Sequence, residues 1–97
     1  MPTYITLLKY TQQGIGNIKR SPARLDAAKR AFTQAGADIR QFYLVLGRYD
    51  AVVISEAPDD ETAARLSLAT ASQGNVSTET LRAFTEEEFR GIVGALP

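Results

Sequence analysis

The chain has 97 residues, a length that suits a single domain over 1–97 and buries roughly two-thirds of the unfolded surface. Its 11 basic and 11 acidic residues cancel and the basic ones are scattered, which argues against nucleic acid or an anionic membrane as a partner. It contains no cysteine and no histidine, which excludes disulfides, thiolate nucleophiles, imidazole bases and the usual ligands of haem and transition metals.

The first half of the chain predicts one strand and one helix. Residues 4–10 read as a strand with two largely apolar faces, and a glycine-containing loop is expected over 11–20. Ser21 and Pro22 predict the start of a helix, because a hydroxyl suits the N-cap and proline the first helical position. Gly36 is the expected end of this helix.

A β-hairpin is the clearest motif of the middle segment. Strands are expected over 38–46 and 51–56, and Gly47-Arg48-Tyr49-Asp50 joins them. Asp59 then has the position of a helix cap, and the helix is expected over 60–73.

The C-terminal segment predicts a fourth strand and a further helix. The strand is expected over 76–84, after Gly74 has ended the preceding helix. Residues 85–88, Thr-Glu-Glu-Glu, have the pattern of a capping box at a helix start. An apolar stripe at helical spacing follows, formed by Phe89, Ile92, Val93 and Leu96.

The order of these elements is β-α-β-β-α-β, which predicts a ferredoxin-like α+β fold. The antiparallel sheet should have the strand order 4-1-3-2, and the C-terminal helix is an addition to it. Both helices would cover one sheet face, so the other apolar face must meet something else. We therefore expect a homodimer or a larger symmetric oligomer that uses the face opposite the helices. The uncharged stretch 66–78 favours this interpretation, although a helix buried in a tight monomer is the alternative.

Chain direction predicts that three segments meet at one end of this sheet, namely residues 14–24, 47–50 and 74–78. The helix start near Ser21 adds free N–H groups that can hold an anion. A small acidic or phenolic ligand is the expected occupant. The alternative is that the glycines only form turns, while Asp50 only pairs with a nearby cation (Lys19, Arg24 or Arg48). The candidate ligand-binding residues are Asn17, Lys19, Arg24, Tyr49, Asp50, Asn75 and Thr78.

The sequence offers no catalytic, metal or cofactor motif, so catalytic residues stay unassigned. No nucleophile–base pair is visible, and Gly14-Ile15-Gly16 lacks the spacing of a phosphate-binding loop. The acidic runs at 59–61 and 86–88 fall at expected helix starts, where they offset the helix dipole. We therefore expect no metal site and no cofactor.

Several motifs of this chain resemble those of the GYD domain family. Gly47-Arg48-Tyr49-Asp50 resembles the naming motif, with Arg48 at its variable place, and residues 11–24, 56–61 and 74–84 resemble other segments of that family. The resemblance implies a ferredoxin-like fold of the dimeric α/β-barrel kind. It implies no catalytic residues, because the family has no settled activity. Wider relatives of that barrel include cofactor-independent monooxygenases, lactone isomerases, haem-handling enzymes and amino-acid-sensing modules.

Three functions remain open at this point. The first is a homo-oligomeric module that binds or senses a small molecule. The alternatives are a cofactor-independent enzyme, monooxygenase-like or isomerase-like, and a purely structural assembly unit. Residues 1–4 lead straight into a strand pattern, and no apolar run approaches the roughly 20 residues that span a bilayer. The cytoplasm is therefore the expected location.

Overall fold

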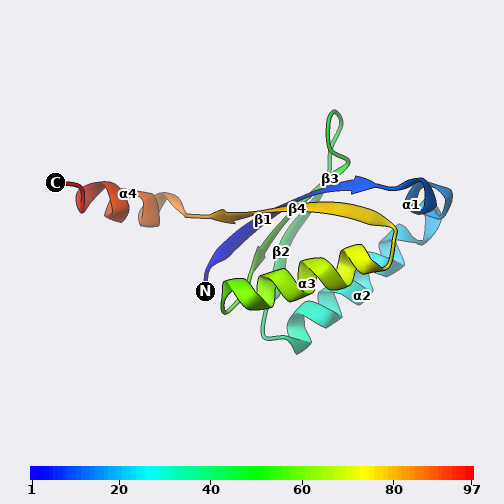
Figure 1. Cartoon of the computed structure of the whole chain (residues 1–97), viewed down its shortest axis with the longest axis horizontal. Helices are drawn as coiled ribbons and strands as arrows, with labels where there is room; N and C mark the ends of the chain where they lie inside the picture. The colour runs from blue at the N-terminus through cyan, green and yellow to red at the C-terminus, as the bar shows by residue number, and fades with distance from the viewer.

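Four antiparallel strands form one sheet in the computed structural model, which describes residues 1–97. The spatial order β2-β3-β1-β4 is 4-1-3-2 when it is read from the β4 edge, and β1 and β2 are not neighbours. The protein is thus a small α+β fold, with helices packed on an antiparallel sheet (Figure 1). The strands are β1 (Thr3–Tyr10), β2 (Asp38–Leu44), β3 (Ala51–Glu56) and β4 (Val76–Ala83).

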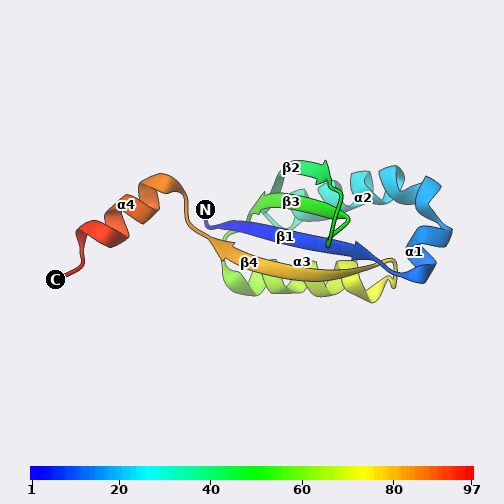
Figure 2. The same ribbon diagram turned by 90° about the horizontal axis from the view of Figure 1, so that it is seen from above.

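Two long helices, α2 (Ser21–Gln34) and α3 (Asp60–Ser72), lie on the same face of the sheet (Figure 1, Figure 2). The predicted cap of α3 is confirmed, because the Asp59 side chain accepts a hydrogen bond of 2.8 Å from the Thr62 backbone N–H. The prediction that Ser21 caps α2 is wrong. A 3-10 turn runs directly into α2, which puts Arg20 at the N-cap position and leaves the Ser21 hydroxyl 2.9 Å from the Tyr10 hydroxyl.

The expected loop over 11–20 is largely helical. It contains α1 (Gln12–Gly16) and the 3-10 turn η1 (Ile18–Arg20). The reason is local: the Thr11 hydroxyl caps α1 by accepting a hydrogen bond from the Gly14 N–H, and it donates one to the Gly74 carbonyl. The first loop is therefore tied to the start of β4.

The β2–β3 hairpin is confirmed, but β2 ends at Leu44, two residues earlier than expected. Residues 45–50 form a hairpin loop that protrudes on the side of the sheet away from the helices (Figure 1). Gly47 has a φ of +128°, in a region that side chains rarely adopt, and the Val45 N–H donates to the Asp50 carbonyl. The chain thus leaves the sheet sooner than the apolar pattern indicates.

The buried core is small and lies where α3 begins. It consists of Tyr4, Ala37, Ala57 and Leu66, with Phe32 packed against it. Tyr4 is 3% exposed and donates a 2.5 Å hydrogen bond to Asp60. Burial, followed by this hydrogen bond, raises the pKa of Tyr4 to about 12. The core therefore anchors one end of the helix layer.

The sheet face away from α2 and α3, here called the open face, carries apolar side chains from three strands. Tyr4 lies in the core beneath the helices, so the alternation along β1 turns Ile5 to the other side. Ile5 pairs with Ile54 on one side and with Leu81 on the other, which forms an apolar row across the sheet. A second row joins Tyr43, Val52, Leu7 and Glu79. Both helices lie on the opposite face (Figure 2).

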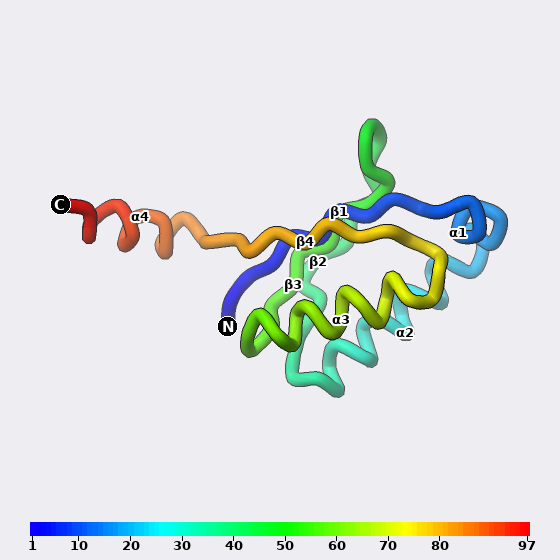
Figure 3. Tube along the Cα trace, viewed as in Figure 1, coloured from blue at the N-terminus to red at the C-terminus, as the bar shows by residue number.

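Helix α4 (Glu86–Gly94) begins with the predicted capping box and extends away from the rest of the chain (Figure 3). The Glu88 N–H donates to the Thr85 hydroxyl, and the Thr85 N–H donates to the Glu88 carboxylate. Its predicted apolar stripe is solvent-exposed, from 46% at Val93 to 65% at Leu96. None of the helices combines the length and apolar character that crossing a bilayer requires.

Candidate functional site

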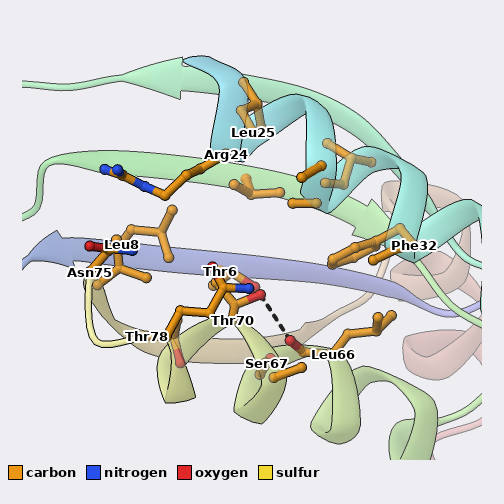
Figure 4. Close-up of a pocket in the computed structure, with 18 of the residues that line it drawn as sticks. Thr6, Leu8, Arg24, Leu25, Phe32, Leu66, Ser67, Thr70, Asn75 and Thr78 are labelled. Atoms are coloured by element: carbon orange, nitrogen blue, oxygen red, sulfur yellow. Dashed lines mark hydrogen bonds between the residues drawn. The ribbon is translucent and has the colours of Figure 1, made fainter. Parts of the chain in front are cut away.

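A cavity of about 180 Å³ lies between the sheet and the two long helices (Figure 4). Thr6 and Leu8 of β1 line it on the sheet side, and Leu25 and Phe32 of α2 line it on the helix side. Leu66 at the edge of the core also contributes. Of the 21 lining residues, 13 are hydrophobic, so the cavity favours an apolar body.

Small side chains explain why this space is not filled. Helix α2 presents three alanines to the cavity, at positions 27, 28 and 31, and α3 presents Ala69. Protein interiors are otherwise packed to the density of organic crystals. Larger residues at these helix positions would close the gap between helices and sheet. The cavity is therefore encoded by the choice of alanine at these helix positions.

Arg24 brings the one charge of this cavity, since the other 20 lining residues are uncharged. Its Nη1 atom donates a hydrogen bond of 3.2 Å to the Asn17 carbonyl. Its Nη2 atom is buried and has no hydrogen-bond partner. Buried polar atoms in proteins are almost always paired, because an unpaired one costs about 1–3 kcal/mol or more. Figure 4 shows the side chain reaching toward the end of the cavity where Leu8 and Asn75 lie.

Hydroxyl groups form a second polar feature, nearer the middle of the cavity (Figure 4). The Thr80 hydroxyl lies 2.9 Å from that of Ser67 and 3.2 Å from that of Thr6. Thr6 and Ser67 both line the cavity, whereas the Thr70 hydroxyl donates to a carbonyl of its own helix. Hydroxyl groups both donate and accept, so this group can bind a polar substituent of either kind.

The structure brings four of the seven candidate residues together. Arg24, Asn75 and Thr78 line the cavity, and Asn17 borders an adjoining surface hollow together with Arg24 and Asn75. Lys19 is exposed and lines neither. Chain direction was therefore a sound guide for the first loop and the start of β4.

Tyr49 and Asp50 lie elsewhere, because the hairpin loop turns away from the helices. Tyr49 donates a 2.5 Å hydrogen bond to Glu79 on the open face, and this hydrogen bond raises the pKa of Tyr49. The Asp50 carboxylate accepts a 2.8 Å hydrogen bond from the Tyr10 backbone N–H. The alternative that Asp50 pairs with a nearby cation is therefore wrong, since none of the ion pairs includes it.

Sequence reasoning missed the apolar part of the cavity, including Leu25, Phe32 and Thr6. The signal was present in two places: the alternation along β1 puts Thr6 and Leu8 on one face, and the helices carry alanine where bulky residues usually pack. Neither pattern by itself distinguishes a packed core from a cavity.

The acidic residues near the helix starts act as caps. The hydrogen bonds that Asp59 and Glu88 accept from backbone N–H groups lower the pKa of both carboxyl groups. No group of three or more potential metal-binding side chains gathers anywhere in the chain.

We expect Asp50→Asn to destabilise the fold by about 1 kcal/mol, because the hydrogen bond from the Tyr10 N–H to Asp50 loses its charged acceptor. Lys19→Met should change stability by less than about 0.5 kcal/mol, since Lys19 is exposed. The double variant should be additive because the two side chains do not interact. Urea unfolding measures all three, and a coupling well above about 0.5 kcal/mol would show that they pair in solution.

Two proteins from Thermus thermophilus are similar to this chain. One, named glutamine synthetase and cystathionine beta-lyase binding protein, is 38% identical over 84 residues, which are 86% of this chain and 88% of the relative. The other is a solved crystal structure that superposes with a TM-score of 0.57 at 28% identity, covering 88% of this chain and 95% of that one.

The family resemblance seen in the motifs is also confirmed. The model of the GYD domain family matches residues 4–93, which include all four strands and both long helices. The chain therefore belongs to the GYD domain family.

Proposed function

We propose that this protein is a homo-oligomeric module that binds a small molecule in the cavity beneath α2 and α3. The observation that carries the proposal is the cavity itself, which is largely apolar and contains a buried guanidinium nitrogen without a partner. Ligand sites in proteins typically combine an apolar lining with a few convergent polar groups. Asn75 and Thr78 are further candidate contacts, because both line the same cavity.

The lining residues support binding rather than catalysis. They include no aspartate, glutamate, lysine or histidine, the side chains that most often transfer protons in enzymes. The hydroxyls of Tyr10 and Ser21, which also line the cavity, lie 2.9 Å from each other. A monooxygenase-like or isomerase-like activity would have to work without a carboxylate, amine or imidazole base in the cavity.

Self-association through the open face is the second part of the proposal. Tyr43 is 51% exposed and Leu81 is 45% exposed on this face, beside the apolar row of Ile5 and Ile54. Contiguous apolar patches of this kind are uncommon on monomers and mark interfaces. Two sheets facing each other would form the dimeric α/β barrel that the ferredoxin-like strand order allows. The exposed stripe of α4 offers a further apolar surface for the assembly.

A protein partner is the third part. The Thermus relative is named for binding two enzymes, which supports a regulatory role in which this cytoplasmic module contacts an enzyme. A module that holds a ligand on one sheet face and assembles through the other could report the ligand to such a partner. This combination of functions explains the cavity better than a purely structural role does, since an assembly unit needs no cavity.

Co-purification and a cavity-filling variant test the proposal. We expect the natively purified protein to retain a small compound that mass spectrometry identifies, and Ala28→Phe to lose it because the ring occupies the cavity. The matched control is Ala64→Phe, on the exposed surface of α3 outside the cavity lining. Retention by Ala28→Phe equal to that of the unmodified protein would contradict the proposed site, provided that its circular dichroism shows a folded chain.

A further inference from the structure

We propose that the ligand of this cavity is a small monocarboxylic acid with a compact aromatic or branched apolar body. This inference rests on the proposed function, because it assigns a chemical class to the ligand of the same cavity. Three features carry it: the charge of the lining, the volume of the cavity and the placement of its polar groups.

The charge of the lining selects a single negative charge. Arg24 is the one charged residue among the 21, and its Nη2 atom is buried without a partner. A guanidinium presents a planar fork of N–H donors that matches a carboxylate, and such charge-assisted hydrogen bonds are about twice as strong as neutral ones. A phosphate monoester would bring about −1.5 to −2 charges to one cation in an apolar space. A simple phenol, with a pKa near 10, would arrive neutral at pH 7.

The volume selects a compact body. An engineered apolar cavity of about 150 Å³ in another protein holds benzene. The cavity here, at about 180 Å³, is slightly larger, so it suits one six-membered ring or a branched chain of similar size plus the carboxylate. Nucleotides and long acyl chains are too large for it.

The placement of the polar groups orients this acid. Arg24 and Asn75 lie at one end of the cavity and Phe32 lies toward the other, with the Thr6 and Ser67 side chains between them (Figure 4). A carboxylate beside Arg24 would therefore direct the apolar body along the cavity toward Phe32 and Leu66. The hydroxyl group formed by Thr6, Ser67 and Thr80 can accept a polar substituent on the middle of that body.

Calorimetric titration with paired probes tests this assignment. Phenylacetate and 3-methylbutyrate should bind, and phenylacetamide, the neutral isostere, should bind roughly 10–100-fold more weakly because it lacks the charge. Phenol and phenyl phosphate should also bind more weakly than phenylacetate. Arg24→Met should weaken phenylacetate by a similar factor and leave phenylacetamide unchanged. The control is Arg30→Met, on the same helix but exposed and outside the lining.

The outcomes separate this inference from the proposed function. Phenylacetamide, phenol or phenyl phosphate binding as tightly as phenylacetate, or Arg24→Met leaving phenylacetate unaffected, would overturn the carboxylate assignment and leave the cavity as a ligand site. Binding of no member of the panel would overturn it too. The proposed function falls only if the Ala28→Phe variant keeps the compound that co-purifies. Melting temperatures of both arginine variants show that the comparison is made between folded proteins.

Discussion

Gly14→Ala is expected to destabilise the fold by about 2–3 kcal/mol, the upper range for forcing extra atoms into a packed site. A Cβ atom at this buried position would lie 2.0 Å from the backbone oxygen of Asn75. Neither atom can move freely, because the same oxygen accepts a 3.0 Å hydrogen bond from the Thr11 N–H. The first loop and the start of β4 would have to separate, and urea unfolding measures the cost.

Gly16→Ala is the matched control for this variant. Gly16 lies in the same short helix α1 and has no positive φ, and a Cβ atom added to it would have no neighbour within 4 Å. We expect the variant to be neutral or slightly stabilising, because alanine restricts the unfolded chain. Because Arg24 bonds to Asn17 of this loop, Gly14→Ala should also reduce retention of the bound compound. Equal stability of the two variants would show that the close contact of Gly14 with Asn75 does not exist in solution.

Leu81→Glu is expected to convert the proposed dimer into a 10.6 kDa monomer without unfolding it. Leu81 is 45% exposed in the single chain, so a carboxylate there stays in contact with water. In the dimer the same carboxylate would be buried beside the apolar row of Ile5 and Ile54. An unpaired buried charge costs about 3–5 kcal/mol, which weakens association more than about a hundredfold. Sedimentation at micromolar concentration measures the change.

Leu68→Glu is the control, because Leu68 is 71% exposed on α3, on the other side of the sheet. It should leave the mass of the assembly unchanged. A 10.6 kDa species for the unmodified protein would contradict self-association altogether. A Leu81→Glu protein that still assembles would move the interface away from the open face, with the exposed stripe of α4 as the next surface to vary.

The sequence predicted those features that depend on local interactions. Asp59 and Thr85 cap their helices as expected, because a cap joins a side chain to backbone groups two or three residues away. The β3 boundaries at Ala51 and Glu56 also agree with the expected range. Ser21 failed as a cap because its hydroxyl found a partner 11 residues away, in Tyr10.

The candidate site was predictable in part. Arg24, Asn75 and Thr78 share the cavity because the direction of successive elements brings their segments to one end of the sheet. Tyr49 and Asp50 were placed there by the same reasoning, but chain direction does not specify on which side of the sheet a hairpin loop emerges. Tyr49 reaches Glu79 on the open face instead.

By itself, the sequence determined the element order, the helix caps, the hairpin and the lack of cysteine and histidine chemistry, all of which follow from residue type and short-range spacing. Only the tertiary structure decided that alanines of α2 and α3 border an unfilled volume between the helices and the sheet, and that the Nη2 atom of Arg24 is buried there without a partner. Those two properties depend on how far the helices stand from the sheet. That distance results from packing among residues that are remote in the chain, and no local pattern records it.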